Sequence, residues 1–111
     1  TTSELVFADF EMNAVNEALK KGLGVYEIVV TVDENCILKA ARAFLVFKNL
    51  EGHCDVIKSE PSTQDIEDEK FEKDFTIVVV SHESRDEVIS IIKSVSEIKT
   101  AEGKAITVPF Q

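Results

Sequence analysis

The chain has 111 residues, of which 44% are hydrophobic, and its 21 acidic side chains outnumber its 12 basic ones to give a formal net charge of -9. This length suits one domain with one core, which buries roughly two-thirds of the surface of the unfolded chain. The negative charge argues against nucleic acid and anionic membrane as partners, because both bind clustered Lys and Arg. We therefore expect a partner with a basic protein surface, and a monomeric isolated domain.

The N-terminus and the cysteines suggest a piece of a longer cytoplasmic protein. The chain begins at Thr1 rather than at a methionine, and it has no signal peptide. No apolar run approaches the ~18 to 20 residues that cross a bilayer. Cys36 and Cys54 form no CxxC motif. We predict that both are small buried apolar groups rather than a disulfide or metal ligands, which suits a reducing compartment.

In chain order, the first three elements are a helix, a strand and an unusually apolar helix. Residues 9–21 carry apolar side chains on one face and predict a short amphipathic helix. Residues 25–32 are rich in β-branched side chains and predict a strand. Residues 36–50 predict a helix with Asp33 as its N-cap. Eleven of these fifteen positions are apolar, so either another element covers the outer face or a partner docks there.

Two strands enclose an acidic connection in the middle of the chain. Residues 54–58 alternate between polar and apolar and predict a strand. Residues 59–73 contain Pro61 and many acids, and predict a loop with about one helical turn. Residues 74–81, DFTIVVVS, predict a third strand.

The last part of the chain predicts a helix and one or two strands. Ser84 is the expected N-cap of a helix with a narrow apolar stripe made of Val88, Ile91, Ile92 and Val95. Residues 96–100 predict a fourth strand. Residues 105–109 are a candidate for one more strand, after a turn at Glu102-Gly103.

The order of these elements predicts an α+β fold of the ferredoxin-like, split βαβ (βαββαβ) class. Right-handed crossovers place two helices on one face of an antiparallel sheet. Because two strands are apolar on both faces, we expect the N-terminal helix to cover part of the other face. The single domain, residues 1–111, then divides into a helical extension at 1–24, a ferredoxin-like core at 25–100, and a C-terminal turn with a candidate edge strand at 101–111.

Few residues suggest catalysis or ligand binding. The motifs of a phosphate loop, a zinc protease and a serine hydrolase are missing from the sequence, so we expect no catalytic residue and no cofactor. His53 and His82 are predicted to be surface or capping residues. The acidic residues 65–74 lack the glycine and the ligand order of an EF-hand, so we expect a solvated, partner-attracting loop and no metal.

Four segments together resemble the response-regulator-binding domain of the chemotaxis histidine kinase CheA. They are ARAFLVFKNLE in the apolar helix, VIKSEPSTQDIED after the second strand, FTIVVVS in the third strand, and SVSEI near the end, and the likeness covers residues 25–98. The resemblance implies a non-catalytic docking module of two-component signalling, whose parent protein is a histidine protein kinase. It also implies that the partner is the response regulator CheY, which is brought close to the kinase for phosphotransfer.

The resemblance suggests a function for the outer face of the apolar helix. At 100° per residue, the sheet-facing positions are predicted to be Cys36, Ala40, Ala43, Phe44, Phe47 and Leu50. The predicted partner contacts are Leu38, Ala41, Arg42 and Leu45 on the opposite side, with Glu87, Ser90 and Ser94 from the second core helix. Alternatively, Leu38 and Leu45 simply flank that second helix. Phe44→Ala is expected to destabilise the fold, and Leu45→Ala to weaken binding.

Two other classes of function remain open. A small-molecule-sensing domain of the ACT type shares the fold, but such sensors usually have a glycine in the turn after the first strand. Here residues 32–35 read VDEN, with two acids and no glycine. A purely structural linker domain is the third class.

Overall fold

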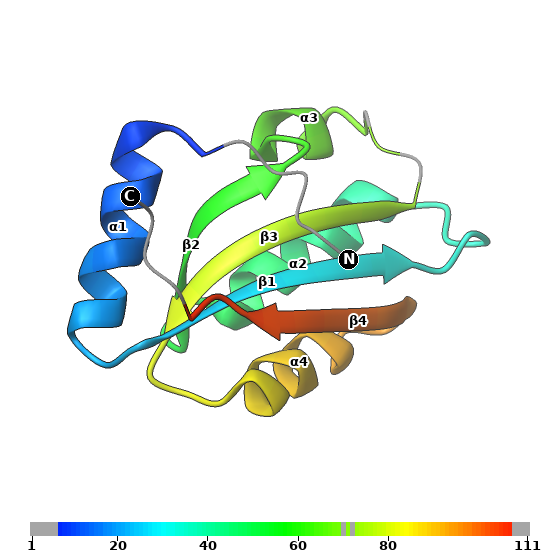
Figure 1. Ribbon diagram of the computed structural model, residues 1–111. Coiled ribbons are helices and arrows are strands. Elements are labelled where there is room, and N and C mark those ends of the chain that lie inside the picture. The colour runs from blue at the N-terminus through cyan, green and yellow to red at the C-terminus, as the bar shows by residue number, and fades with distance from the viewer. Residues whose placement is uncertain (1–6, 70, 72, 108–111) are drawn as a thin grey trace.

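A four-stranded antiparallel sheet in the order β2-β3-β1-β4 forms the centre of the molecule (Figure 1). Its strands are β1 (Gly24–Val32), β2 (Cys54–Glu60), β3 (Asp74–Ser81) and β4 (Ile98–Ala105). The computed structural model describes residues 7–69, 71 and 73–107. The two most apolar strands, β1 and β3, pair with each other in the middle, where both of their faces can be covered. The predicted ferredoxin-like plan is confirmed.

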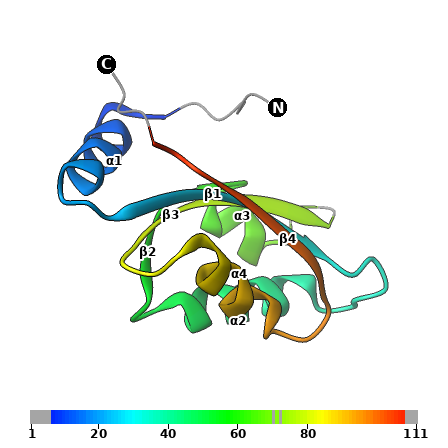
Figure 2. The ribbon, with the colours of Figure 1, turned by 60° about the horizontal axis from the view of Figure 1, so that its bottom comes forward.

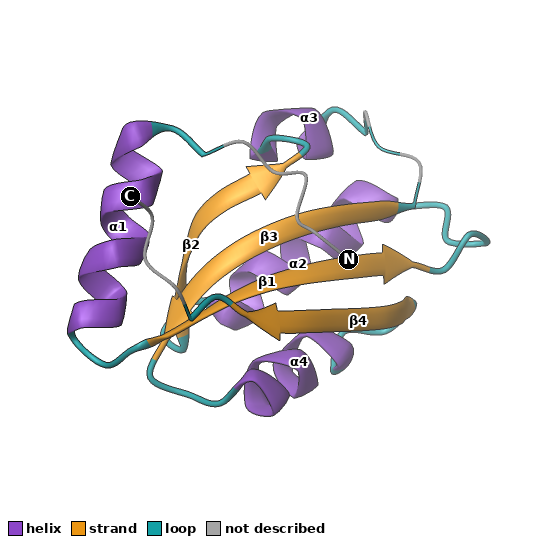
Figure 3. Ribbon diagram, viewed as in Figure 1, coloured by secondary structure: helices purple, strands orange, loops and turns teal. Residues whose placement is uncertain are grey.

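Three helices lie on one face of the sheet, and one helix covers part of the other face (Figures 2 and 3). On the first face lie α2 (Lys39–Leu50) and α4 (Arg85–Lys93), with the short α3 (Thr63–Glu67) beside α2. The main core lies between these helices and the sheet, and its fully buried members include Ile28, Val30, Ile66, Phe75, Ile77 and Ile92. Alternate residues of the two central strands, β1 and β3, supply much of this core, as expected for a pleated sheet.

The N-terminal helix α1 (Asp9–Lys20) lies across one end of the opposite face, as Figure 2 shows. A second apolar cluster fills the space beneath it and contains Val15, Ala18, Val25, Val78 and Val80. Lys58 of β2 donates to Glu11 of α1 at 3.3 Å, and both side chains are largely buried. The predicted partial cover of this face by the N-terminal helix is therefore confirmed.

The C-terminal part of the sheet differs from the prediction. No turn forms at Glu102-Gly103, because β4 continues through both residues to Ala105 and Gly103 pairs with Ile28. A Cβ at Gly103 would lie 3.0 Å from Cγ1 of Ile28, so glycine permits close packing there. The candidate strand at 105–109 is not formed at Ile106 and Thr107, and residues 108 and 109 lie outside the described part of the chain.

The start of α2 also differs from the prediction. The helix begins at Lys39, three residues later than expected, and Leu38 rather than Asp33 is its N-cap. The Asp33 carboxylate instead accepts a hydrogen bond from the Asn35 N–H at 2.9 Å. An aspartate that bonds to the backbone two residues on favours a turn over a helix. Residues 33–38 therefore form a loop between β1 and α2.

Candidate docking surface

An exposed apolar patch lies on the outer side of α2 and on the loop before it. Ile37 is 89% exposed, Leu38 61%, Phe44 57% and Leu45 37%, and the exposed Ala41 lies between them. These five residues, here called the apolar patch, recur at the three- and four-residue spacing that places side chains on one side of a helix. Exposed apolar side chains gathered on one side of a helix typically mark a contact site for another protein.

The orientation of α2 was predicted incorrectly by about 60°. The fully buried residues of α2 are Ala43, Val46 and Leu50, whereas Phe44, predicted to face the sheet, points to solvent. Turning Phe44 inward would bring Lys48, one helical turn later, toward the sheet, and burying its charge without a partner is costly. Lys48 is the signal in the sequence that could have placed Phe44 outside. Val46 was not assigned to either face by the sequence.

The other predicted inner positions of this segment agree better with the structure. Cys36 is 3% exposed and belongs to the main core. Phe47 is partly buried and packs against Phe75, with ring centroids 5.8 Å apart. Ala40, one turn before Ala43, is half-buried. Burying these residues together with Leu50 leaves the apolar patch as the only unburied apolar side of α2 among the described residues.

The orientation of α4 agrees with the prediction. Ser84 is its N-cap, and the Ser84 hydroxyl accepts a hydrogen bond from the Glu87 N–H at 3.2 Å. Val88 and Ile92 are fully buried, while the predicted contacts Glu87, Ser90 and Ser94 are exposed. The amide of Asn49 in α2 donates to the Ser94 hydroxyl at 3.4 Å. The polar outer side of α4 is thus continuous with the outer side of α2.

Arg42 differs from the other predicted contacts because it bonds within the domain. Its side chain is only 28% exposed. Its guanidinium donates to the Ser96 hydroxyl at 3.0 Å and to the Glu97 carboxylate at 3.1 Å. The structure therefore brings Leu38, Ala41 and Leu45 together on one exposed surface, and ties Arg42 to the turn between α4 and β4.

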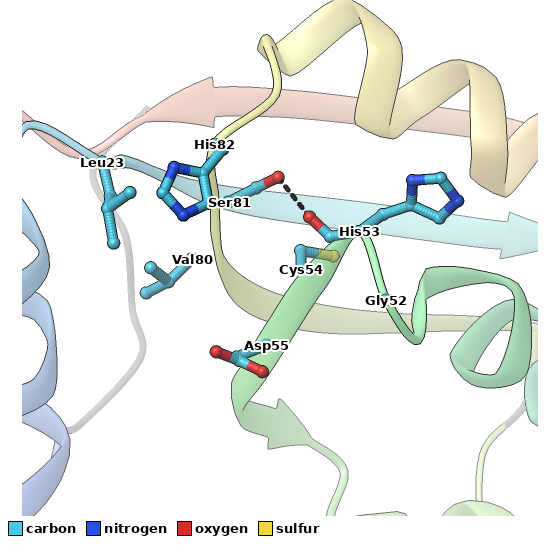
Figure 4. Close-up of a pocket in the computed structure, with 8 residues that line it drawn as sticks. All are labelled: Leu23, Gly52, His53, Cys54, Asp55, Val80, Ser81 and His82. Carbon is cyan, nitrogen blue, oxygen red and sulfur yellow. Dashed lines mark hydrogen bonds between the residues drawn. The ribbon is translucent and has the colours of Figure 1, made fainter.

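The histidines and Cys54 lie near one another at the end of the sheet where β2 begins and β3 ends. These residues line a hollow of about 210 Å³. Figure 4 shows that the rings of His53 and His82 point in different directions. His53 Nδ1 lies 2.9 Å from a Glu83 carboxylate oxygen, and the Ser81 hydroxyl donates to the His53 carbonyl at 2.6 Å. Within the described residues, no three His, Cys, Asp or Glu side chains are grouped so that they could hold a metal ion.

Both cysteines are free thiols with raised pKa values. Burial raises the pKa of the Cys36 thiol, and burial together with the nearby Asp55 and Glu83 raises the pKa of the Cys54 thiol to about 11. A thiol with such a pKa stays protonated near neutral pH and packs as a small apolar group. In the described ranges, no helix is both long enough and apolar enough to span a membrane.

Comparison with known proteins assigns a family to this arrangement. The family model of the P2 response regulator binding domain matches residues 25–104. The chemotaxis protein CheA of Bacillus subtilis (strain 168) is 35% identical over 102 residues, which are 92% of this chain and 15% of that protein. The chemotaxis protein CheA of Listeria monocytogenes is 34% identical over 74 residues, which are 67% of this chain and 12% of that protein. The chain therefore spans less than a sixth of the length of these relatives.

A solved structure gives the same assignment. The P2 domain of the chemotaxis kinase CheA from Thermotoga maritima, solved in complex with the response regulator CheY, is similar with a TM-score of 0.73 and 32% sequence identity. The match covers 77% of this chain and 100% of that domain. Sequence and fold thus agree over the sheet and the helices that carry the apolar patch, and this chain belongs to the family of P2 response regulator binding domains.

Proposed function

We propose that this chain is a docking module that binds the response regulator CheY and raises its concentration near a histidine kinase for phosphotransfer in chemotaxis. The observation that carries this proposal is the apolar patch on α2, in a chain of the P2 family. The similar domain of Thermotoga maritima was solved in complex with CheY. Family membership also favours docking over the small-molecule-sensing and linker functions.

The proposed docking surface has an apolar centre on α2 and a polar rim on α4. Leu38, Ala41 and Leu45 are the predicted contacts in the centre, and the structure adds Ile37 and Phe44. The rim contains Glu87, Ser90 and Ser94. An apolar centre inside a polar rim is the usual composition of a protein interface, and aromatic side chains often dominate its binding energy.

The negative charge of the chain lies mostly outside this surface. The two helices carry five basic residues (Lys39, Arg42, Lys48, Arg85 and Lys93) but only two acidic residues (Asp86 and Glu87). Residues 60–74, which include α3, contain seven acidic and two basic residues. Charge should therefore attract a basic regulator from a distance, and apolar contact should hold it.

We place this function in the cytoplasm and within a longer kinase. The two free thiols fit a reducing compartment. Since a regulator must leave after it receives a phosphoryl group, we expect a micromolar complex, worth roughly -8 kcal/mol.

An NMR titration of the labelled domain with CheY tests the proposal. We expect the amides of residues 37–48 and of α4 to shift and those of the opposite sheet face to remain unchanged. Phe44→Ala should weaken binding. Phe10→Ala is the matched control, because Phe10 is 73% exposed but lies on α1, on the other side of the sheet. Shifts concentrated on α1 and the opposite sheet face would contradict the proposed surface.

Calorimetric titration with free amino acids separates docking from small-molecule sensing. We expect no heat of binding from amino acids and a measurable heat from CheY. The reverse result would favour the ACT-type function.

A further inference from the structure

The turn between α4 and β4 holds an unusual residue. Glu97 has a φ of 67°, in the left-handed region that residues other than glycine seldom occupy. Such a conformation persists only where the surrounding contacts maintain it, and it is found frequently at functional sites. The contacts of Glu97 are therefore informative.

Glu97 binds two parts of the segment that carries the apolar patch. Its carbonyl oxygen accepts a hydrogen bond from the Asp33 N–H at 2.7 Å, at the start of the 33–38 loop. Its carboxylate accepts a hydrogen bond from Arg42, in the first turn of α2, at 3.1 Å. The guanidinium of Arg42 also donates to Ser96 at 3.0 Å. The loop and the helix start are thus both tied to one turn of the chain.

Further bonds within the loop continue this connection toward the patch. The Cys36 N–H donates to the Asp33 carbonyl at 2.9 Å, and the Lys39 ammonium donates to the Cys36 carbonyl at 2.9 Å. The Cys36 side chain is anchored in the main core. Ile37 and Leu38 follow directly and are more exposed than Phe44 and Leu45 of the same patch. Ile37 lies before the regular helix, and Leu38 joins it only as the N-cap, whose carbonyl accepts a hydrogen bond from the Arg42 N–H at 3.1 Å.

We propose that Arg42 and Glu97 are positioning residues of the docking surface. Their ion pair, here called the Arg42–Glu97 clamp, holds the 33–38 loop against the first turn of α2, so that Ile37 and Leu38 lie beside Ala41 and Leu45. Arg42 then supports docking through these neighbours rather than by contacting the partner. This inference rests on the proposed function, because it names what maintains the surface that binds CheY.

The geometry of Arg42 favours positioning over a general contribution to stability. Isolated ion pairs near the surface contribute little to stability. The Nε atom of Arg42 is buried and has no hydrogen-bond partner among the described residues. A buried donor without a partner disfavours the folded state, so Arg42 is a poor residue for stability alone. Its guanidinium bonds to Ser96 and Glu97 instead favour a role in holding the turn in place.

A double-mutant cycle with CheY tests the clamp. Arg42→Met keeps the length of the side chain but removes its charge and donors. We expect Arg42→Met and Leu38→Ala each to weaken binding about fivefold, and the double variant to be little weaker than either single one, because the two changes act on the same contact. Phe44→Ala, farther along the helix, is the control and should weaken binding by the same factor with and without Arg42.

Two results of this cycle would overturn the inference. The first is unchanged affinity in Arg42→Met. The second is an equal cost of Leu38→Ala in both backgrounds, because the two losses would then be independent and Arg42 would be a direct contact. Should Arg42→Met melt at a much lower temperature, Arg42→Lys keeps the charge but loses one of the two bonds, and the same comparison applies.

Hydrogen exchange tests the clamp without any partner. In Arg42→Met we expect amides of residues 34–38 to exchange at least about tenfold faster, while those of residues 46–50 stay unchanged. Unchanged exchange in the loop would disprove the clamp even if CheY binds. If the unaltered chain fails to bind CheY, the proposed function fails, and the exchange result alone then decides whether the clamp exists.

Discussion

The helices α2 and α4 cover the same face of the sheet, but they bury very different shares of their apolar surface. In α4, Val88 and Ile92 are fully buried, and the exposed positions are occupied by polar residues such as Glu87 and Ser90. In α2, Ala43, Val46 and Leu50 are fully buried, yet Phe44 and Leu45 remain exposed. The α4 helix has only the apolar surface that the core requires, whereas α2 has more than the sheet can cover. The surplus on α2 is the part available to a partner.

Removing a buried side chain should have the largest effect and should be similar in both helices. We expect Leu50→Ala in α2 and Ile92→Ala in α4 each to lower the free energy of unfolding by about 2 to 5 kcal/mol, because both side chains are fully buried. Urea denaturation measures this. A loss below about 1 kcal/mol for Leu50→Ala would show that the inner face of α2 is assigned incorrectly.

Phe44→Ala should separate binding from folding most clearly. The ring is 57% exposed, so we expect a change of less than about 0.5 kcal/mol in the free energy of unfolding. Affinity for CheY should fall by about 2 kcal/mol, as for a central aromatic contact. Calorimetry and thermal melting measure the two quantities, with Phe10→Ala as the control. Severe destabilisation would restore the orientation of α2 that the sequence predicted.

Leu45→Ala should have a smaller effect, since Leu45 is only 37% exposed and offers less surface. We expect affinity for CheY to fall by ~1 to 2 kcal/mol. Ser90→Ala is the matching change on α4 and should alter affinity by less than about 0.5 kcal/mol, because rim positions contribute little. Equal losses in the two variants would mean that α2 and α4 contribute alike, and that the contrast between the helices has no functional meaning.

The cap of α4 should affect stability but not the apolar contact. Ser84→Ala removes the acceptor for the Glu87 N–H, and we expect a loss of about 1 kcal/mol in the free energy of unfolding. The start of α2 has no side-chain cap, so Leu38→Ala should cost less stability than Ser84→Ala. Thermal denaturation of both variants provides the comparison.

Salt should have the smallest effect, and it should act on association rather than on dissociation. Because the acidic residues cluster outside the two helices, charge steers the encounter and is screened over about 10 Å at 0.1 M salt. We expect the association rate to fall several-fold between low and near-molar salt, with dissociation nearly unchanged. Stopped-flow measurements follow both rates, and a salt-independent association rate would refute the role of charge.

Local patterns predicted most of the fold because they are clear in this chain. The β-branched strands 25–32 and 74–81, the Ser84 cap and the apolar stripe of α4 each allow only one arrangement. The order of elements, combined with right-handed crossovers, then requires the observed sheet. Of the candidate site, the predicted contacts Leu38, Ala41, Leu45, Glu87, Ser90 and Ser94 are all exposed. Their role in binding remains a prediction.

Three features depended on the tertiary structure. The orientation of α2 is only weakly indicated, by Lys48, in a segment that is apolar on nearly every side, and packing against the sheet buries Val46 in place of Phe44. The loop at 33–38 and the continuous β4 depend on contacts between distant residues, such as Asp33 with Glu97 and Gly103 with Ile28. The sequence by itself determined which elements form and in what order, since propensity and periodicity are local. Only packing decided which apolar side chains were left for a partner, since burial is shared among elements that meet in space.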